Sequence, residues 1–335
     1  MLSYLAQRVL QIVPLLLVLT LLIFIIMELP PGDYLTSHIL NLQRSGTLVS
    51  KEEIARLTEQ YGLDKPFLYR YGKWMWNMVR YGSMGRSFMW NRPVKEVIGE
   101  RVALTVVIAV VTIVVQYLVA MPIGIYAATH QYKFMDYLLT FVAFVGTSVP
   151  GFLLALVLVY FSFSSLGVSV TGLFAPEYAN APWTPAKVGS MLQRIWIPVI
   201  IIGLSGTAYL MRTTRAMLLD ELRKQYVITA RAKGVSERKL LFKYPVRVAI
   251  NPIVSTLGWA LPQVISGIPL VAIVLNLPVI GPDLVRALMY QDMYLAGGIL
   301  LALSVMTVVG TLISDIMLAL LDPRIRYGGV GNELT

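Results

Sequence analysis

Long uncharged stretches alternate with polar connections along most of this chain. The first apolar run extends from Val9 to Met27 and follows Arg8. Five further apolar runs cover residues of about 102–128, 137–165, 193–211, 249–277 and 294–321. A helix needs roughly 20 mostly apolar residues to cross the hydrocarbon core of a bilayer, and these runs are about that long or longer. The pattern predicts an all-α, polytopic membrane protein with about six transmembrane helices.

The first apolar run has the position of a secretory signal sequence. It is longer than a signal's apolar region and lacks an Ala-x-Ala cleavage site, so we interpret it as an uncleaved first span. With six spans, both chain ends lie on one side of the membrane. The loop 212–247, the connection from His130 to Asp136 and the C-terminal tail then share the side of Met1.

The loop 212–247 is strongly basic, with only Asp220, Glu221 and Glu237 as acids. Its cations are Arg212, Arg215, Arg223, Lys224, Arg231, Lys233, Arg238, Lys239, Lys243 and Arg247. Because short loops rich in Lys and Arg stay in the cytoplasm, both termini are predicted to be cytoplasmic and the protein to lie in the cell membrane. Residues 30–101, 166–192 and 278–293 then face outward.

Composition removes several classes of protein. Hydrophobic residues make up 57% and charged residues 14%, with a mean hydropathy of +0.70, whereas soluble domains carry about a quarter charged residues. There is no cysteine, and His38 and His130 lack the spacing of metal ligands, so no metal site is expected. The net charge of +10 is concentrated in a loop between spans, which favours a protein or anionic-lipid partner over nucleic acid.

Residues 30–101 form a polar and aromatic insert between the first two spans. Turn signals such as Pro30-Pro31-Gly32-Asp33 punctuate it, and helices are predicted at about Lys51 to Tyr61 and Leu68 to Met78. Ser50 and Glu53 have the spacing of a capping box for the first of these helices. The segment is long enough to form a small extracytoplasmic insert.

The sequence shows few features of an enzyme or of an ion-coupled transporter. There is no phosphate-binding loop, Gly-x-Ser-x-Gly elbow or His-Glu-x-x-His pair. Glu28, Asp136 and Asp315 lie at or near span ends, whereas a pump or proton-coupled carrier should show ionisable residues within its spans. A stand-alone secondary transporter or channel, and an intramembrane enzyme, are therefore the weaker alternatives, and no catalytic residue is assigned.

Neutral polar residues and helix-breaking residues mark the candidate translocation pathway. Neutral polar side chains in a span either form hydrogen bonds between helices or line a water-filled passage. A proline in a span frees backbone carbonyls, which must be satisfied by neighbouring helices or by water in a cavity. The pathway candidates are Gln116, Ser148, Gln263, Ala272 and Asn276.

The basic loop has the pattern of two short helices joined at a glycine. Tyr226 to Lys233 favours a helix, Gly234 can end it in a left-handed conformation, and Ser236 can cap a second helix that begins at Glu237. The small Ala230 and Ala232 are expected to fit a partner's groove. A plain basic loop that sets topology and binds anionic lipid is the alternative.

Several motifs along the chain resemble binding-protein-dependent ABC importer permeases of the dipeptide/oligopeptide/nickel branch. The stretch from Tyr226 to Leu241 resembles the family's coupling loop. The other motifs are Pro31-Gly32-Asp33, Tyr61 to Pro66, Gly85 to Phe88, Pro93-Val94, Ser148 to Phe152 and the C-terminal Leu321 to Tyr327.

Two departures from the family pattern concern coupling and substrate. Importers in general have Glu-Ala-Ala before the glycine. This chain has Ile228-Thr229-Ala230 there, which is expected for the dipeptide/oligopeptide/nickel branch. Ala272 and Ile273 stand where peptide permeases usually carry an acid and a threonine, and the residues 276–282 and 291–297 look more like members that carry oligosaccharides. The resemblance therefore leaves oligopeptide and oligosaccharide open.

The resemblance implies a division of the chain and a set of partners. The expected parts are residues 1–29 with the first span, the extracytoplasmic insert 30–101, a five-helix permease core 102–327 with coupling loop 212–247, and the tail 328–335. The expected partners are a homologous second permease, two cytoplasmic ATPases that hold ATP and Mg, an external substrate-binding protein and membrane lipids. The chain itself would bind no cofactor and catalyse no reaction. Its ATPase-docking residues would be Thr229, Ala230, Arg231, Ala232, Lys233, Gly234, Ser236, Glu237 and Arg238.

Overall fold

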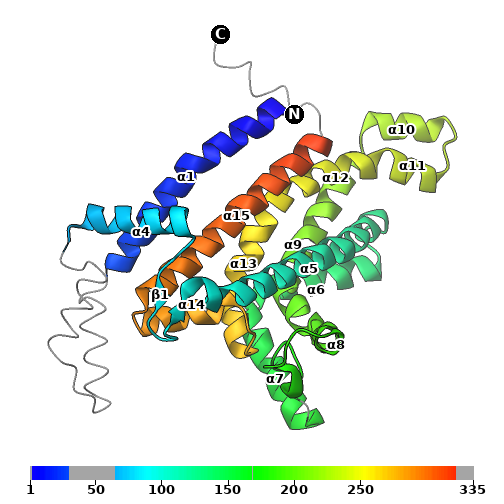
Figure 1. Cartoon of the computed structure of the whole chain (residues 1–335). Helices are drawn as coiled ribbons and strands as arrows, with labels where there is room; N and C mark the ends of the chain where they lie inside the picture. Colours follow the sequence, from blue (N-terminus) through cyan, green and yellow to red (C-terminus); the bar gives the residue numbers. More distant parts are fainter. Residues whose placement is uncertain (1, 30–64, 168, 322–335) are drawn as a thin grey trace. The chain divides into compact units, whose positions relative to one another are not determined.

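The computed structural model describes residues 2–29, 65–167 and 169–321, and nearly all of its regular structure is helical (Figure 1). The helices are α1 Leu2–Glu28, α4 Phe67–Tyr81, α5 Val94–Thr129, α6 Phe134–Ser148, α7 Gly151–Leu166, α8 Pro185–Arg194, α9 Trp196–Leu222, α10 Gln225–Ala232, α11 Glu237–Lys243, α12 Pro245–Ser255, α13 Leu257–Val274, α14 Ile280–Met289 and α15 Met293–Leu321. A short 3₁₀ helix, η1, covers Pro176–Tyr178, and β1 (Arg86–Ser87) pairs antiparallel with β2 (Arg92–Pro93). The all-α membrane fold is confirmed.

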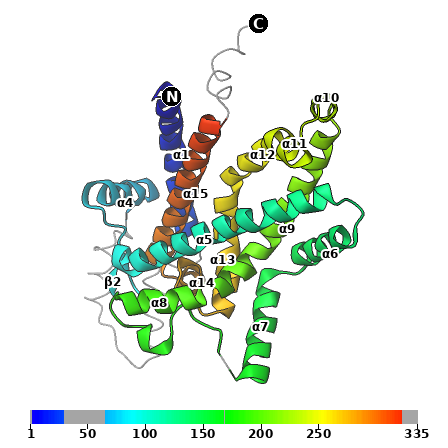
Figure 2. The same cartoon turned by 90° about the vertical axis from the view of Figure 1, so that its right-hand side faces the viewer.

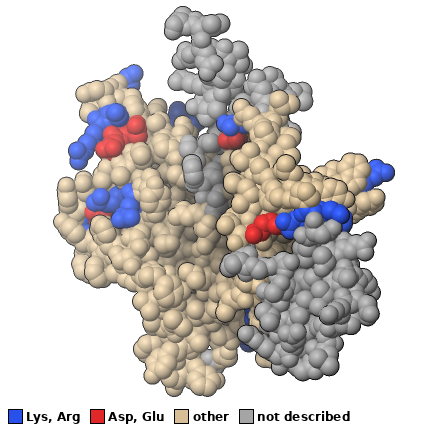
Figure 3. All heavy atoms as spheres, turned by 90° about the vertical axis from the view of Figure 1, so that its left-hand side faces the viewer, with Lys and Arg blue, Asp and Glu red and all other residues tan. Residues whose placement is uncertain are grey.

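Apolar helices long enough to span a membrane account for most of the predicted runs. In the described part of the chain these are Leu10–Glu28, Val94–Thr129, Trp196–Leu222 and Met293–Ile313, and the bent pair α6 and α7 makes a fifth if it is one span. The predicted run 249–277 is helical but divided between α12 and α13. Charged side chains form a few small groups on an otherwise uncharged face, which suits a protein embedded in lipid (Figure 3).

The bend between α6 and α7 has a local cause. The two helices turn by 100° over a break of two residues, Val149 and Pro150. A residue before proline is pushed out of the helical conformation, and Val149 has extended angles of φ −86° and ψ 121°. The Ser-Val-Pro-Gly motif noted in the sequence therefore redirects the chain.

The insert helix predicted at Leu68 to Met78 is confirmed as α4, whose end is marked by Gly82 at φ +61°. The other predicted insert helix with its capping box, the Pro-Gly-Asp turn, and nearly all of the C-terminal motif lie outside the described residues.

The chain divides into two compact units. The larger comprises Met1–Leu5, Thr105–Pro278 and Thr307–Thr335, and the smaller comprises Ala6–Leu104 and Val279–Met306. In the larger unit α9 packs against α5, α6 and α12 through small side chains, chiefly Ala120, Ala127, Ala143 and Ala208. Small residues let membrane helices approach closely.

Residues of two of the noted motifs meet in the smaller unit. The Asp292 carboxylate accepts hydrogen bonds from the Ser87 hydroxyl at 2.6 Å and from the backbone N–H groups of Phe88 and Met89 at 2.9 and 3.0 Å. The turn between β1 and β2 is thereby fixed to the start of α15. A second cluster joins α5, α14 and α15 through Val94, Ile280 and Leu295.

The helices α5 and α9 approach each other closely at Gly124. A Cβ atom there would lie 2.6 Å from Thr214 Cβ and 2.8 Å from the Met211 carbonyl oxygen. We expect Gly124→Ala to destabilise the protein by about 1–3 kcal/mol, because the helices must separate to admit the methyl group. Thermal unfolding of the purified chain in detergent measures this change.

Gly99 on the same helix provides the matched control, because a Cβ atom there would meet nothing within 4 Å. Gly99→Ala should be neutral or stabilising by up to about 1 kcal/mol, since alanine favours a helix over glycine. Equal shifts of the melting temperature for the two variants would contradict the packing described for Gly124.

Candidate functional site

The predicted elbow is present and consists of α10, the turn Lys233 to Ser236, and α11. Gly234 adopts φ +78°, which confirms its predicted left-handed conformation. Its N–H donates to the Arg231 carbonyl at 3.0 Å, and the N–H of Val235 donates to the Ala230 carbonyl at 3.3 Å. This pair of bonds is a Schellman motif, in which a left-handed glycine satisfies the last carbonyls of a helix. Glycine fits here because its backbone tolerates a positive φ without cost.

The start of α11 differs from the prediction in one detail. Ser236 occupies the N-cap position, but its side chain makes no capping hydrogen bond. Glu237 instead bridges back to α10, accepting from Arg231 Nε at 2.6 Å and from an Arg231 Nη at 3.2 Å. The hydrogen bond and charge of Arg231 hold the pKa of the Glu237 carboxyl below its usual value. The prediction that the Ser236 side chain caps α11 was wrong, although Ser236 occupies the N-cap position and its carbonyl accepts from the Leu240 N–H at 2.8 Å.

The interior of the elbow is a small apolar cluster of its own. Val227 and Leu240 are fully buried, Ala230 is 8% exposed, and Val235 and Tyr244 pack against them. Ala230 therefore stabilises the elbow from within, and the expectation that it fits a partner's groove is corrected. The sequence reasoning missed Val227 and Leu240, although Val227 and Ala230 have the three-residue spacing of one helix face.

The elbow packs against the ends of α5, α9 and α12. Leu241 and Leu222 pack against a cluster formed by Ala128 of α5, Leu218 of α9, and Val246 and Ala249 of α12. Figures 1 and 2 show α10 and α11 together at one end of α9 and α12, projecting from the other helices of this unit. Leu241 thus joins α11 to α5, α9 and α12 by apolar contacts.

A tyrosine closes the junction between α9 and α10. The Tyr226 hydroxyl donates to a Glu221 carboxylate oxygen at 2.5 Å. Burial, the hydrogen bond and the charge of Glu221 together raise the pKa of Tyr226 to about 12. The raised pKa means that the phenol contributes stability that is fully present below the ordinary pKa and is lost as the pH rises from about 10 to about 12.

We therefore expect Tyr226 to remain a phenol at pH 11. Ultraviolet titration of the native chain and of Tyr226→Phe measures the ionised tyrosines. The two curves should coincide near pH 10 and diverge only toward pH 12, and a difference that is complete by pH 10.5 would contradict the predicted shift.

The outer surface of the elbow carries most of the predicted docking residues. Within this set, Ala230 is the buried exception. The exposed members are Thr229, Arg231, Ala232, Lys233, Gly234, Ser236, Glu237 and Arg238. Exposed Lys224, Lys239 and Lys243 add further positive charge around them.

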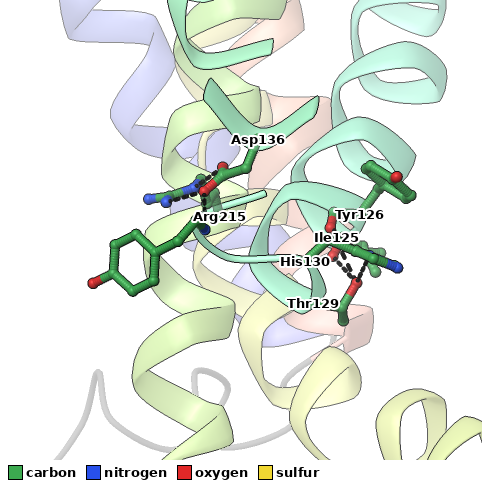
Figure 4. A network of polar contacts seen from close by, with 7 residues as sticks. Ile125, Tyr126, Thr129, His130, Asp136 and Arg215 are labelled. Atoms are coloured by element: carbon green, nitrogen blue, oxygen red, sulfur yellow. Dashed lines mark hydrogen bonds and ion pairs between the residues drawn. The ribbon is translucent and has the colours of Figure 1, made fainter. Parts of the chain in front are cut away.

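An ion pair holds α6 against α9 within the same unit (Figure 4). Arg215 donates two hydrogen bonds to the two oxygens of Asp136, at 2.7 and 2.8 Å. The backbone N–H of Tyr132 adds a bond of 3.0 Å to Asp136, whose side chain is only 2% exposed. Arg212 and Arg215 had been assigned to the loop 212–247, but α9 continues through them to Leu222. The segment 212–222 contains no glycine or proline and is rich in helix-forming residues.

A separate polar group caps α5 at its C-terminal end (Figure 4). The Thr129 hydroxyl donates to the carbonyls of Ile125 and Tyr126 at 3.0 and 3.1 Å, and the His130 ring stacks on Tyr126 with centroids 4.3 Å apart. These contacts order the chain just before it turns into α6. His130 thus contributes to the packing at the end of α5.

The predicted pathway residues fall into a buried and an exposed group. Gln116 is buried, and its amide donates to the Gly203 carbonyl at 3.3 Å, which favours helix packing over pathway lining. Ala272 is fully buried, whereas Ser148, Gln263 and Asn276 are exposed.

Asn276 follows the end of α13 with φ +49°, and the next N–H, of Leu277, donates to the Ala272 carbonyl at 2.9 Å. It therefore ends α13 much as Gly234 follows the end of α10. The backbone of Asn276 thus has a structural role, and its exposed side chain remains available for other contacts.

The comparisons with known proteins cover both halves of the chain. Residues 120–327 match the family described as binding-protein-dependent transport system inner membrane component, and residues 1–109 match the N-terminal region of such membrane components. The oligopeptide transport system permease protein AppB of Bacillus subtilis is 32% identical over 98% of this chain and 100% of its own length.

Two further relatives are similar over the same extent. A putative peptide transport system permease protein of Brucella abortus is 30% identical, and the dipeptide transport system permease protein DppB of Alkalihalophilus pseudofirmus is 28% identical, each over 98% of this chain and 100% of the relative. The chain therefore belongs to the family of binding-protein-dependent transport system inner membrane components and is a multi-pass permease subunit of an ABC importer.

Proposed function

We propose that this permease works in an ATP-driven importer with a homologous second permease, two cytoplasmic ATPases and an external binding protein. The observation that carries the proposal is the elbow of α10 and α11. Its exposed cations can pair with acidic residues of a partner, while Leu241 links it to α5, α9 and α12. Movement of the ATPases on binding ATP and Mg would thus shift the spans.

The mechanism requires two states of the spans and no bond-making residue. ATP-driven closure of the ATPases would favour the outward-open state, and hydrolysis would return the spans to the inward-open state. An elbow that contacts its partner differently in the two states shifts their populations. Both chain ends and the elbow face the cytoplasm in this account, and residues 278–293 face the binding protein.

Short peptides are the proposed cargo. The printed names of the relatives favour peptides. The contrary argument for oligosaccharides uses Ala272, Ile273 and the residues 276–282 and 291–297. Within its unit Ala272 is fully buried, whereas Ile273 is 46% exposed, so of this pair only Ile273 presents a surface. We place the passage beside the exposed Ser148, Gln263 and Asn276.

Purification of the tagged full chain from its native membrane tests the assembly. A second permease and an ATP-binding protein should copurify, and the reconstituted complex should take up labelled peptide only with ATP, Mg and the binding protein. Uptake by this chain alone, driven by an ion gradient, would instead favour a secondary transporter. Uptake of labelled oligosaccharide but not peptide would correct the cargo and leave the assembly intact.

A further inference from the structure

The helix α4 is fixed to the last turns of the first span. The Phe24 ring packs against Phe67, Tyr71 and Trp74 with centroid distances of 5.3, 5.5 and 5.7 Å. Arg70 forms an ion pair of 2.5 Å with Glu28, the last residue of α1. Figures 1 and 2 both show α4 crossing α1 rather than continuing along it. Because Leu10–Glu28 is a candidate span, α4 lies at the level where that span leaves the hydrocarbon.

The outward side of α4 is apolar and aromatic. Leu68, Trp76 and Val79 are 74%, 63% and 77% exposed, and with Gly72 they follow the four- and three-residue spacing of one helix face. Tyr69 lies beside this stripe and is also exposed. The buried Trp74 lies on the other side, against α1.

The charge on α4 has one sign. The helix contains Arg70, Lys73 and Arg80 and no acidic residue. Lys73 and Arg80 are exposed and lie along one edge of the apolar stripe, while Arg70 is held by Glu28. Apolar residues flanked by cations are the pattern of helices that lie in the membrane interface, where Trp and Tyr are also enriched.

We propose that the Leu68, Trp76 and Val79 face of α4 lies in the lipid interface, at the membrane surface opposite the Met1 end of α1, with Lys73 and Arg80 on anionic phospholipid headgroups. The occupant is lipid because the helix is held at the depth of the span end, and because Lys73 and Arg80, which pair with no acid among the described residues, match phosphate. The face fixes the depth of α4 beside the span α1, which itself crosses the bilayer. This proposal is independent of the elbow and of ATP.

The natural absence of cysteine makes the test direct, because any introduced cysteine carries a unique label. Val79→Cys and Leu68→Cys place a nitroxide on the apolar stripe. Arg92→Cys provides the control, since the Arg92 side chain is 62% exposed in the hairpin of the same unit. The full chain is reconstituted in vesicles of phosphatidylcholine with phosphatidylglycerol, and the accessibility of each label to oxygen and to a water-soluble nickel complex is measured.

In lipid alone, the labels at 68 and 79 should report a depth of about 5–10 Å in the headgroup and acyl boundary, and the label at 92 should report water. Reversing Lys73 and Arg80 to Glu should weaken this insertion roughly fivefold for each lost cation, in vesicles with phosphatidylglycerol and much less in pure phosphatidylcholine. Both results would support the proposal.

Labels at 68 and 79 that are as accessible to the nickel complex as the label at 92 would overturn it. The same applies if those labels become protected only after the external binding protein is added, because the face would then be a protein contact. Since all three labelled positions are exposed, the nitroxide can be attached without displacing neighbouring side chains.

Discussion

Replacing Gly234 with proline is expected to abolish substrate uptake by the assembled importer while the spans still fold. Gly234 has φ +78° and donates its N–H to the Arg231 carbonyl, whereas proline is held near φ −65° and has no N–H. Proline also disfavours the φ −75°, ψ 6° conformation of Lys233 before it. The angle between α10 and α11 should therefore change, and the proposed contact surface for the ATPases should be lost with it. Substrate-stimulated ATP hydrolysis and uptake, measured together in proteoliposomes, check this.

Two other substitutions at Gly234 separate backbone conformation from side-chain bulk. A Cβ atom at this position would meet nothing within 4 Å in this chain, so any loss of stability of the elbow itself comes from the backbone. Asparagine tolerates the left-handed conformation and should retain most of the uptake. Alanine should be intermediate, since the left-handed conformation costs it about 1–2 kcal/mol. Proline with uptake equal to that of the native chain would contradict the role given to the elbow.

Breaking the pair of Asp136 and Arg215 should have the largest effect on stability. Asp136→Ala leaves the Arg215 guanidinium, which is 25% exposed, without the partner that accepts its two hydrogen bonds. Breaking a largely buried pair by removing one member costs about 3 kcal/mol, because the remaining charge is uncompensated. The N-terminal turn of α6 should separate from α9, which thermal unfolding in detergent would show as a lower melting temperature.

The exposed pair of Arg231 and Glu237 serves as the control. Their side chains are 48% and 69% exposed, and surface ion pairs contribute little to stability. Glu237→Gln should leave the melting temperature unchanged. Arg215→Met should cost at least as much as Asp136→Ala, since it leaves the Asp136 carboxylate, which is only 2% exposed, with the Tyr132 N–H but without its cation. A fall as large for Glu237→Gln as for Asp136→Ala would mean that burial does not decide the effect.

Much of the fold was predictable because membrane spans depend on length and hydrophobicity. The insert helix α4 and the glycine turn of the elbow were also predictable, because each depends on local pattern or on one residue's backbone freedom. The bend at Val149 and Pro150 was visible as a break, but its 100° angle was not, since the packing around it sets that angle.

The parts that sequence reasoning missed are contacts between segments far apart in the chain. Arg215 looked like one of many loop cations because its partner, Asp136, is 79 residues away. Ala230 looked like a docking residue because its cover, Leu240, belongs to another helix. Gln116 looked like a pathway residue, but in the structure its side chain packs against Gly203 and Gly206 of α9. Such assignments depend on tertiary packing, which no local pattern encodes.

Photo-crosslinking from the elbow tests the central claim most directly. Ala232→Cys, exposed at the end of α10, carries a cysteine-reactive benzophenone in the assembled complex, and Asn180→Cys, exposed between η1 and α8, carries the same label as a control. Illumination should attach the ATP-binding subunit to the label at 232 and not to the label at 180, with a yield that changes when ATP and Mg are added. Absence of any ATP-binding subunit from the products at 232, in a complex that still takes up substrate, would contradict the account.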